Sequence, residues 1–102
     1  MKTRREMLEE FLAADPADSF SRYALALELE KEGRDSEAIS ALQGVLDMDQ
    51  KYVPAYYHLG RLLGRGGRTD EARAVYTHGL AAALEAGDQR THAEIQEAIE
   101  LL

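Results

Sequence analysis

The chain has 102 residues, a hydrophobic fraction of 45% and a formal net charge of −7. This length suits one small domain that can bury a core. A surface that shares 19 acidic and 12 basic residues repels the phosphate backbone that dominates nucleic-acid binding, so we expect no nucleic-acid partner. The chain has no cysteine, which excludes disulfides, thiolate metal sites and a thiol nucleophile.

No part of the chain approaches the run of roughly 18 apolar residues that a membrane span needs. The basic N-terminal residues are followed by Glu6, Glu9 and Glu10, which interrupt the apolar run of a secretion signal. We therefore expect a cytoplasmic protein without a membrane partner.

Residues 3–14 are predicted to form the first helix. Thr3 and Glu6 have the spacing of a capping box. One apolar face repeats at helical spacing and consists of Met7, Leu8, Phe11 and Leu12. Pro16 ends this helix, because the residue before a proline is pushed out of helical geometry.

Two antiparallel helix pairs are predicted over residues 18–46 and 53–86. In the first pair, Gly33 favours a left-handed C-cap, and Asp35 is expected as the N-cap of the following helix. In the second pair, Pro54 suits the first turn of one helix, and Thr69 is expected as the N-cap of the other. That last helix continues to residue 86 before Gly87, so it is longer than its counterpart.

A sixth helix is predicted at the end of the chain. It begins at Asp88 or at Thr91, and the second choice places Glu94 at the spacing of a capping box. Its apolar face is formed by Ala93, Ile95, Ala98, Ile99 and Leu102. The remaining positions are polar, as expected of a helix that caps a stack of repeats.

A period of 34 residues relates the two pairs. Eight residues of the second pair have the same residue at the position 34 earlier: Tyr57, Leu59, Leu63, Gly67, Arg68, Glu71, Ala72 and Leu80 repeat Tyr23, Leu25, Leu29, Gly33, Arg34, Glu37, Ala38 and Leu46. A fixed period of this size is typical of architectures in which neighbouring helix pairs stack on one another. We therefore expect six helices and no strand.

The 34-residue period, the turn within each helix pair and the positions of the small residues together resemble the tetratricopeptide repeat (TPR). Residues 53–86 match its pattern at Tyr56, Leu59, Gly60, Gly67, Ala72 and Tyr76, and residues 19–52 match at Leu25, Ala26, Gly33, Ala38 and Leu42. Arg22 stands where an aromatic residue is usual, and Gly79 replaces a common alanine. The resemblance implies an all-α fold, a right-handed α-solenoid of stacked antiparallel helix pairs. It implies one domain over residues 1–102, with a half-repeat helix in 1–18, repeats in 19–52 and 53–86, and a capping helix in 87–102.

The same resemblance implies a non-catalytic protein–protein interaction module that binds a peptide or a partner helix in a concave groove. The first helix of each pair lines such a groove, and the expected partner-binding residues are Tyr23, Leu27, Tyr57, His58, Arg61 and Arg65. Residues 58, 61 and 65 form one positive stripe in an acidic protein, which favours a partner with acidic groups.

Structural roles for these residues remain open alternatives. Arg65 can interact with the C-terminus of its own helix, and Arg61 can pair with a glutamate of a neighbouring helix. Tyr23 and Leu27, together with Phe20, can instead belong to a core beneath the first helix.

We expect no enzyme and no cofactor. His58, His78 and His92 lie on three predicted helices, and none has a second histidine or a cysteine at the spacing of a zinc site. The glycines at 64, 66 and 67 follow a helix, whereas a phosphate-binding loop follows a strand.

Self-association is the alternative function. Two repeats with flanking helices are few for a stable stack, and a second copy can complete an exposed end. Phe11 and Phe20 are the residues expected in such a homodimer interface. A role as a subunit of a larger assembly is a further alternative.

Overall fold

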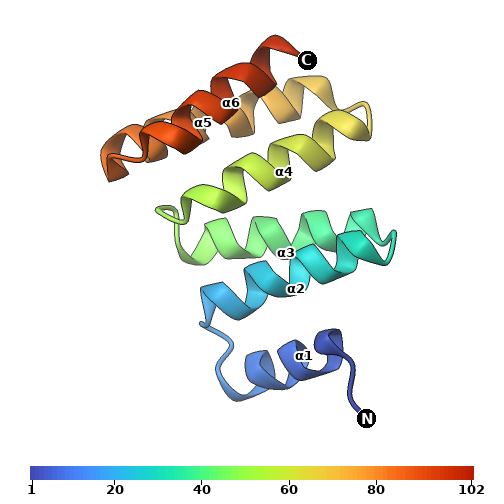
Figure 1. Cartoon of the computed structure of the whole chain (residues 1–102). Helices are drawn as coiled ribbons and strands as arrows, with labels where there is room; N and C mark the ends of the chain where they lie inside the picture. The colour runs from blue at the N-terminus through green and yellow to red at the C-terminus, as the bar shows by residue number, and fades with distance from the viewer. The chain divides into compact units, whose positions relative to one another are not determined.

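The computed structural model describes residues 1–102, which form six α-helices and no strand (Figure 1). The helices are α1 (Arg4–Ala14), α2 (Ser19–Lys31), α3 (Asp35–Met48), α4 (Val53–Arg65), α5 (Thr69–Ala86) and α6 (Gln89–Glu100). The prediction of an all-α chain with six helices is confirmed. No helix is long and apolar enough to cross a membrane.

The helices belong to two compact units, Met1–Asp49 and Gln50–Leu102. In the first unit, α2 packs against both α1 and α3. In the second unit, α5 packs against α4 and α6, and α6 also contacts α4. Each unit therefore contains one helix pair and one additional helix.

Side chains cap three of the helices at their N-termini. Thr3 and Glu6 form the predicted capping box at α1, and Asp18 accepts a hydrogen bond of 3.1 Å from the backbone N–H of Ser21 at α2. Asp88 accepts one of 3.0 Å from the N–H of Thr91, so α6 begins at the first of its two predicted starts.

The predicted N-caps Asp35 and Thr69 are wrong, because each is the first residue of its helix. The N-cap positions are held by Arg34 and Arg68, and no side chain caps the backbone there. The turn before each helix sets this start. A glycine with φ of 76° or 81° reverses the chain, and the next N–H, that of the arginine, donates to a carbonyl of the preceding helix over 2.9 Å.

The same arginine–glutamate pair follows both turns. Arg34 donates two hydrogen bonds of 2.9 and 2.8 Å to Glu37, and Arg68 donates two of 3.0 and 2.7 Å to Glu71. These bonds raise the pKa of both arginines and lower the pKa of Glu71. A carboxylate in the first helical turn is also favoured by the helix dipole, so the pair compensates for the missing side-chain cap.

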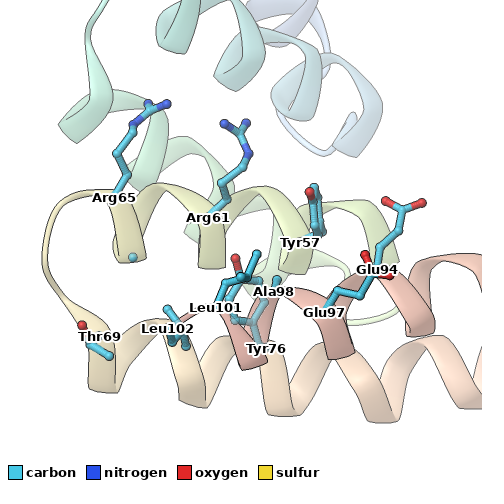
Figure 2. A pocket seen from close by; sticks show the side chains of 11 residues that line it. Tyr57, Arg61, Arg65, Thr69, Tyr76, Glu94, Glu97, Ala98, Leu101 and Leu102 are labelled. Carbon is cyan, nitrogen blue, oxygen red and sulfur yellow. The ribbon is translucent and has the colours of Figure 1, made fainter.

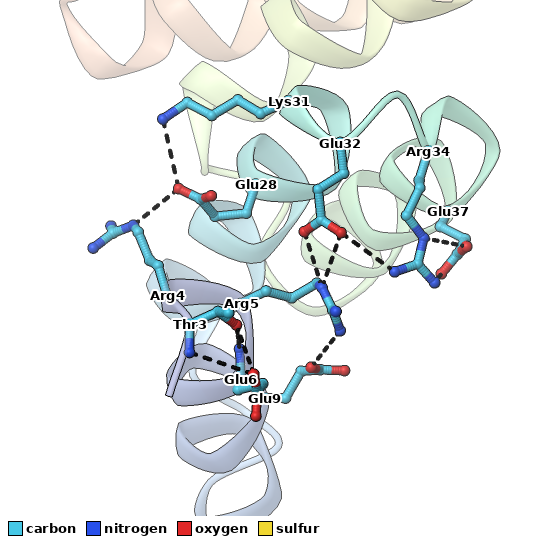
Figure 3. Close-up of polar contacts among 10 residues, drawn as sticks. All are labelled: Thr3, Arg4, Arg5, Glu6, Glu9, Glu28, Lys31, Glu32, Arg34 and Glu37. Carbon is cyan, nitrogen blue, oxygen red and sulfur yellow. Dashed lines mark hydrogen bonds and ion pairs between the residues drawn. The ribbon is translucent and has the colours of Figure 1, made fainter. Parts of the chain in front are cut away.

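Ion pairs connect α1 to α2 (Figure 3). Arg4 lies 3.2 Å from Glu28, and Arg5 lies 2.9 Å from Glu32. Leu8 is the one buried residue of α1. The helix is therefore held by one buried apolar side chain and by ion pairs at the surface of the unit, which are individually weak.

Arg22 takes over a role of the aromatic residue that is usual at its position. In the second unit, the Tyr56 hydroxyl donates to the carbonyl of Gln50 over 2.7 Å. Thirty-four residues earlier, Arg22 Nη2 donates to the carbonyl of Pro16, also over 2.7 Å. Both side chains thus satisfy a carbonyl six residues back, just before the repeat's first helix. The stem of Arg22 lies beside Gly44, where an added Cβ would be 3.3 Å from its Cδ.

The two aspartate caps make the stability of the fold depend on acidity. Hydrogen bonds from Ser21 lower the pKa of Asp18, and those from Thr91 lower the pKa of Asp88. A lowered pKa means that the stabilisation is present above the ordinary aspartate value of 3.8 and is lost as the pH falls through the folded-state pKa. We expect the melting temperature to fall between pH 6 and pH 3. An Asp18→Asn/Asp88→Asn variant keeps cap acceptors that do not titrate, so its melting temperature should fall by a few degrees less. Equal falls in both proteins would contradict the role of the caps.

Candidate partner-binding groove

Three predicted site residues form a row along α4. Tyr57, Arg61 and Arg65 stand four residues apart, so they lie on one face of the helix. Figure 2 shows their side chains in this order, with both guanidinium groups pointing away from α5. Arg61 is half-buried and Arg65 is exposed.

A cavity of about 400 Å³ lies beside this row and is bounded by α4, α5, α6 and the two residues after α6. Its lining residues are Tyr57, Arg61, Gly64, Arg65, Thr69, Tyr76, Glu94, Glu97, Ala98, Leu101 and Leu102. Much of the lining is apolar, including Tyr76, which is only 3% exposed. Ligand cavities in proteins typically start at about 300 Å³, with apolar walls and a few polar groups, so the size and lining suit a short segment of a partner.

Helix α6 supplies an acidic wall that the sequence did not indicate. Glu94 and Glu97 project from α6 beside the cavity (Figure 2). Their involvement depends on how α6 packs against α4, which the repeat period does not specify. The available signal was the spacing of Glu94, Glu97, Ala98 and Leu101, which places two carboxylates and two apolar residues on neighbouring parts of one helix surface.

His58 belongs to the same surface through its neighbours. Its Nδ1 lies 3.2 Å from Arg61 Nη2, and since arginine can only donate, Nδ1 is the acceptor in this contact. The ring of His58 also meets the ring of Tyr57 edge to face, with centroids 5.4 Å apart. These contacts hold the two ring side chains and Arg61 as one group.

A second cavity extends the first toward the N-terminus of α4. It has a volume of about 240 Å³ and is lined by Pro54, Tyr57, His58, Thr91 and Glu94. Tyr57 and Glu94 line both cavities. We call the two together the α4–α6 groove, and it follows α4 from Pro54 to Arg65.

Tyr76 forms part of the apolar wall of the groove. Burial raises the pKa of its hydroxyl, the neighbouring Tyr57 raises that pKa further, and Arg61 opposes the effect. A tyrosine hydroxyl is protonated at neutral pH even at its ordinary pKa of 10.0, so this group is a hydrogen-bond donor there.

The other predicted residues lie in the first unit. Tyr23 and Leu27 are half-buried on α2, at the positions 34 residues before Tyr57 and Arg61. The alternative that placed Phe20 in a core is wrong, because this side chain is 64% exposed. Phe11 on α1 is 56% exposed.

The structure contains no group of three or more histidine, cysteine, aspartate or glutamate side chains that could hold a metal ion.

Comparisons with known proteins agree on one family. The family model described as the tetratricopeptide repeat matches residues 29–99. A tetratricopeptide repeat domain protein from Salinibacter ruber, solved by NMR, is 42% identical, with a TM-score of 0.79 over 83% of this chain and 86% of that one. The crystal structure of such a domain protein from the same organism is 41% identical, with a TM-score of 0.77 over 80% and 91%.

A protein from Bordetella parapertussis covers more of the chain. Its solution structure is 31% identical, with a TM-score of 0.83 over 98% of this chain and 87% of that one. None of the curated proteins matches this chain. The relatives therefore identify the type of repeat.

Proposed function

The chain belongs to the tetratricopeptide repeat family, whose domains are generally non-catalytic protein–protein interaction modules, and on this premise we propose that it binds a protein segment with acidic groups in the α4–α6 groove. Arg61 and Arg65 bind the carboxylates, while Tyr57 and Tyr76 contact apolar parts of the segment. The resemblance to this family and the TPR-like fold class expected from the sequence are confirmed.

One observation carries the proposal: two arginines one turn apart line the same cavity as Tyr76 and Leu101. A guanidinium group presents a planar fork of donors that matches a carboxylate. The rest of the chain carries a large excess of acidic residues, so an acidic segment is attracted to the Arg61–Arg65 end of the groove and repelled by most of the remaining surface.

The first unit has the equivalent positions on its own repeat helix. Tyr23 and Leu27 occupy on α2 the places that Tyr57 and Arg61 occupy on α4, and both are half-buried. We propose that they form apolar contacts with a partner on the first unit, and that His58 contributes on the second unit through its contact with Arg61.

An Arg61→Glu/Arg65→Glu variant tests this function. We expect its affinity for a fluorescein-labelled peptide of glutamate and leucine residues to fall by about a hundredfold or more, since like charges then face one another across the contact. Fluorescence anisotropy measures the affinity, and helical circular dichroism checks that the variant folds.

A matched control changes the net charge by the same amount outside the groove. Lys2→Glu/Arg73→Glu reverses two charges that line neither cavity of the groove, and its affinity should stay close to that of the unaltered chain. If the two variants lose affinity equally, the general field of the protein attracts the peptide and the groove does not.

A homodimer is the second candidate function, and the exposure of Phe11 and Phe20 favours it. Both aromatic side chains are more than half exposed on the first unit, and a second copy would bury their apolar surface. Light scattering coupled to size exclusion should then give the mass of a dimer, and Phe11→Gln/Phe20→Gln should reduce it to that of a monomer. A monomer mass for the unaltered chain at tens of micromolar would rule out this candidate.

A further inference from the structure

Contacts at both ends of the α4–α6 groove show in which direction its two helices run. Gly64 of α4 meets Leu102, whose Cδ2 would lie 3.1 Å from an added Cβ. At the other end, Pro54 and Thr91 line one cavity. Helices α4 and α6 therefore run side by side, with their N-termini at one end of the groove and their C-termini at the other.

This register places Glu94 at one end of the row on α4 and Arg65 at the other. Glu94 lines both cavities together with Tyr57, and Figure 2 shows Arg65, Arg61, Tyr57 and Glu94 in sequence along the groove. Glu97 follows Glu94 by one turn of α6 and lines the larger cavity, and between these two glutamates and the arginines lie apolar side chains, among them Ala98 and the ring of Tyr76. The groove has an acidic end, an apolar middle and a basic end.

From this order we propose that the partner segment carries both charges: a basic side chain for Glu94, an apolar one for the middle and an acidic one for the Arg61–Arg65 end. This inference rests on the proposed function and narrows its partner from an acidic segment to one of mixed charge. A purely acidic segment would place a carboxylate beside Glu94, where like charges repel.

The length of the groove sets the spacing of the two charges. Tyr57, which lies beside Glu94, and Arg65 are eight residues apart on α4, which corresponds to about 12 Å at 1.5 Å per residue. An extended chain covers this distance in about four residues at roughly 3.3 Å each.

An extended segment also brings the three side chains to the groove together. In an extended chain, residues i, i+2 and i+4 lie on one face. The sequence Lys-x-Leu-x-Glu therefore presents the basic, apolar and acidic side chains to the groove together.

Three fluorescein-labelled peptides test this inference on the full chain by fluorescence anisotropy. The first contains Lys-Ser-Leu-Ser-Glu, the second replaces its lysine by glutamate, and the third replaces its glutamate by lysine. We expect the mixed peptide to bind about tenfold more tightly than the doubly acidic one, a ratio that corresponds to about 1.4 kcal/mol, and the doubly basic peptide to bind most weakly.

Variants of α6 then assign the preference to its two glutamates. Glu94→Gln/Glu97→Gln should bring the mixed and doubly acidic peptides to equal affinity, and Glu94→Lys/Glu97→Lys should favour the doubly acidic peptide. Glu100→Gln, on the same helix but outside the groove lining, should keep the original preference. Circular dichroism confirms that each variant is folded.

The possible failures are distinguishable. Equal affinity of the mixed and doubly acidic peptides for the unaltered chain would overturn the mixed-charge partner, and so would a preference that survives Glu94→Gln/Glu97→Gln. If both peptides still depend on Arg61 and Arg65, the proposed function stands without this inference. If none of the three peptides binds, both are wrong.

Discussion

An Ile95→Ala variant is expected to lose about 2–5 kcal/mol of its free energy of unfolding, the usual effect of truncating a fully buried isoleucine. Ile95 is 0% exposed and is the one buried residue of α6. Its Cδ1 lies against Gly79 of α5, where an added Cβ would come within 2.9 Å. The truncation leaves a cavity at the contact that holds α6 on the second unit, so the acidic wall of the groove should also become mobile.

Urea denaturation followed by circular dichroism measures this loss. Ile99→Ala is the matched control, because it removes the same atoms from the same helix at a half-buried position, and it should cost less. Equal losses of unfolding free energy in the two variants would contradict the role of Ile95 in holding α6 on the second unit.

A Gly79→Ala variant is expected to be less stable than the unaltered chain, even though alanine is the better helix former by about 1 kcal/mol. An added Cβ would lie 2.7 Å from the Cβ of Tyr56, an atom next to the backbone that cannot move away without shifting α4. Overpacking of this kind costs about 1–3 kcal/mol. The net loss should be up to about 2 kcal/mol, which lowers the melting temperature of a domain of this size by about 4–8 °C per kcal/mol.

Gly44→Ala provides the control for helix propensity. The new Cβ would lie 3.3 Å from Cδ of Arg22, which belongs to a flexible side chain, so this variant should be as stable as the unaltered chain or more stable. Thermal unfolding by circular dichroism compares the two variants. A melting temperature for Gly79→Ala at or above that of Gly44→Ala would contradict the tight contact of α4, α5 and α6.

The helices could be predicted from the sequence because local signals and the repeat period agree. The capping box at Thr3, Pro54 in the first turn of α4 and the left-handed glycines that end α2 and α5 are all present. The starts of α3 and α5 were wrong for a physical reason. Residue preference favours Asp35 and Thr69 as caps, but the hydrogen bonds of the preceding turn already place the helix start one residue earlier.

The basic row on α4 could also be predicted, because residues on one helix face follow from spacing alone. The acidic wall could not, since it depends on the register of α6 against α4. That register is set where Ile95 fills the space that Gly79 leaves beside Tyr56. The glycine at residue 79, where the family pattern has alanine, is the sequence signal for this contact. The packing of α6 explains it, because a Cβ at this position would meet Tyr56 and Ile95.

The most direct test of the central claim is an NMR titration of the ¹⁵N-labelled chain with the Lys-Ser-Leu-Ser-Glu peptide. If the α4–α6 groove binds the segment, the largest shifts of the backbone amide signals should occur at Tyr57, Arg61, Arg65, Glu94 and Leu101. Shifts confined to α1 and α3, or none at peptide concentrations that saturate the anisotropy signal, would contradict it.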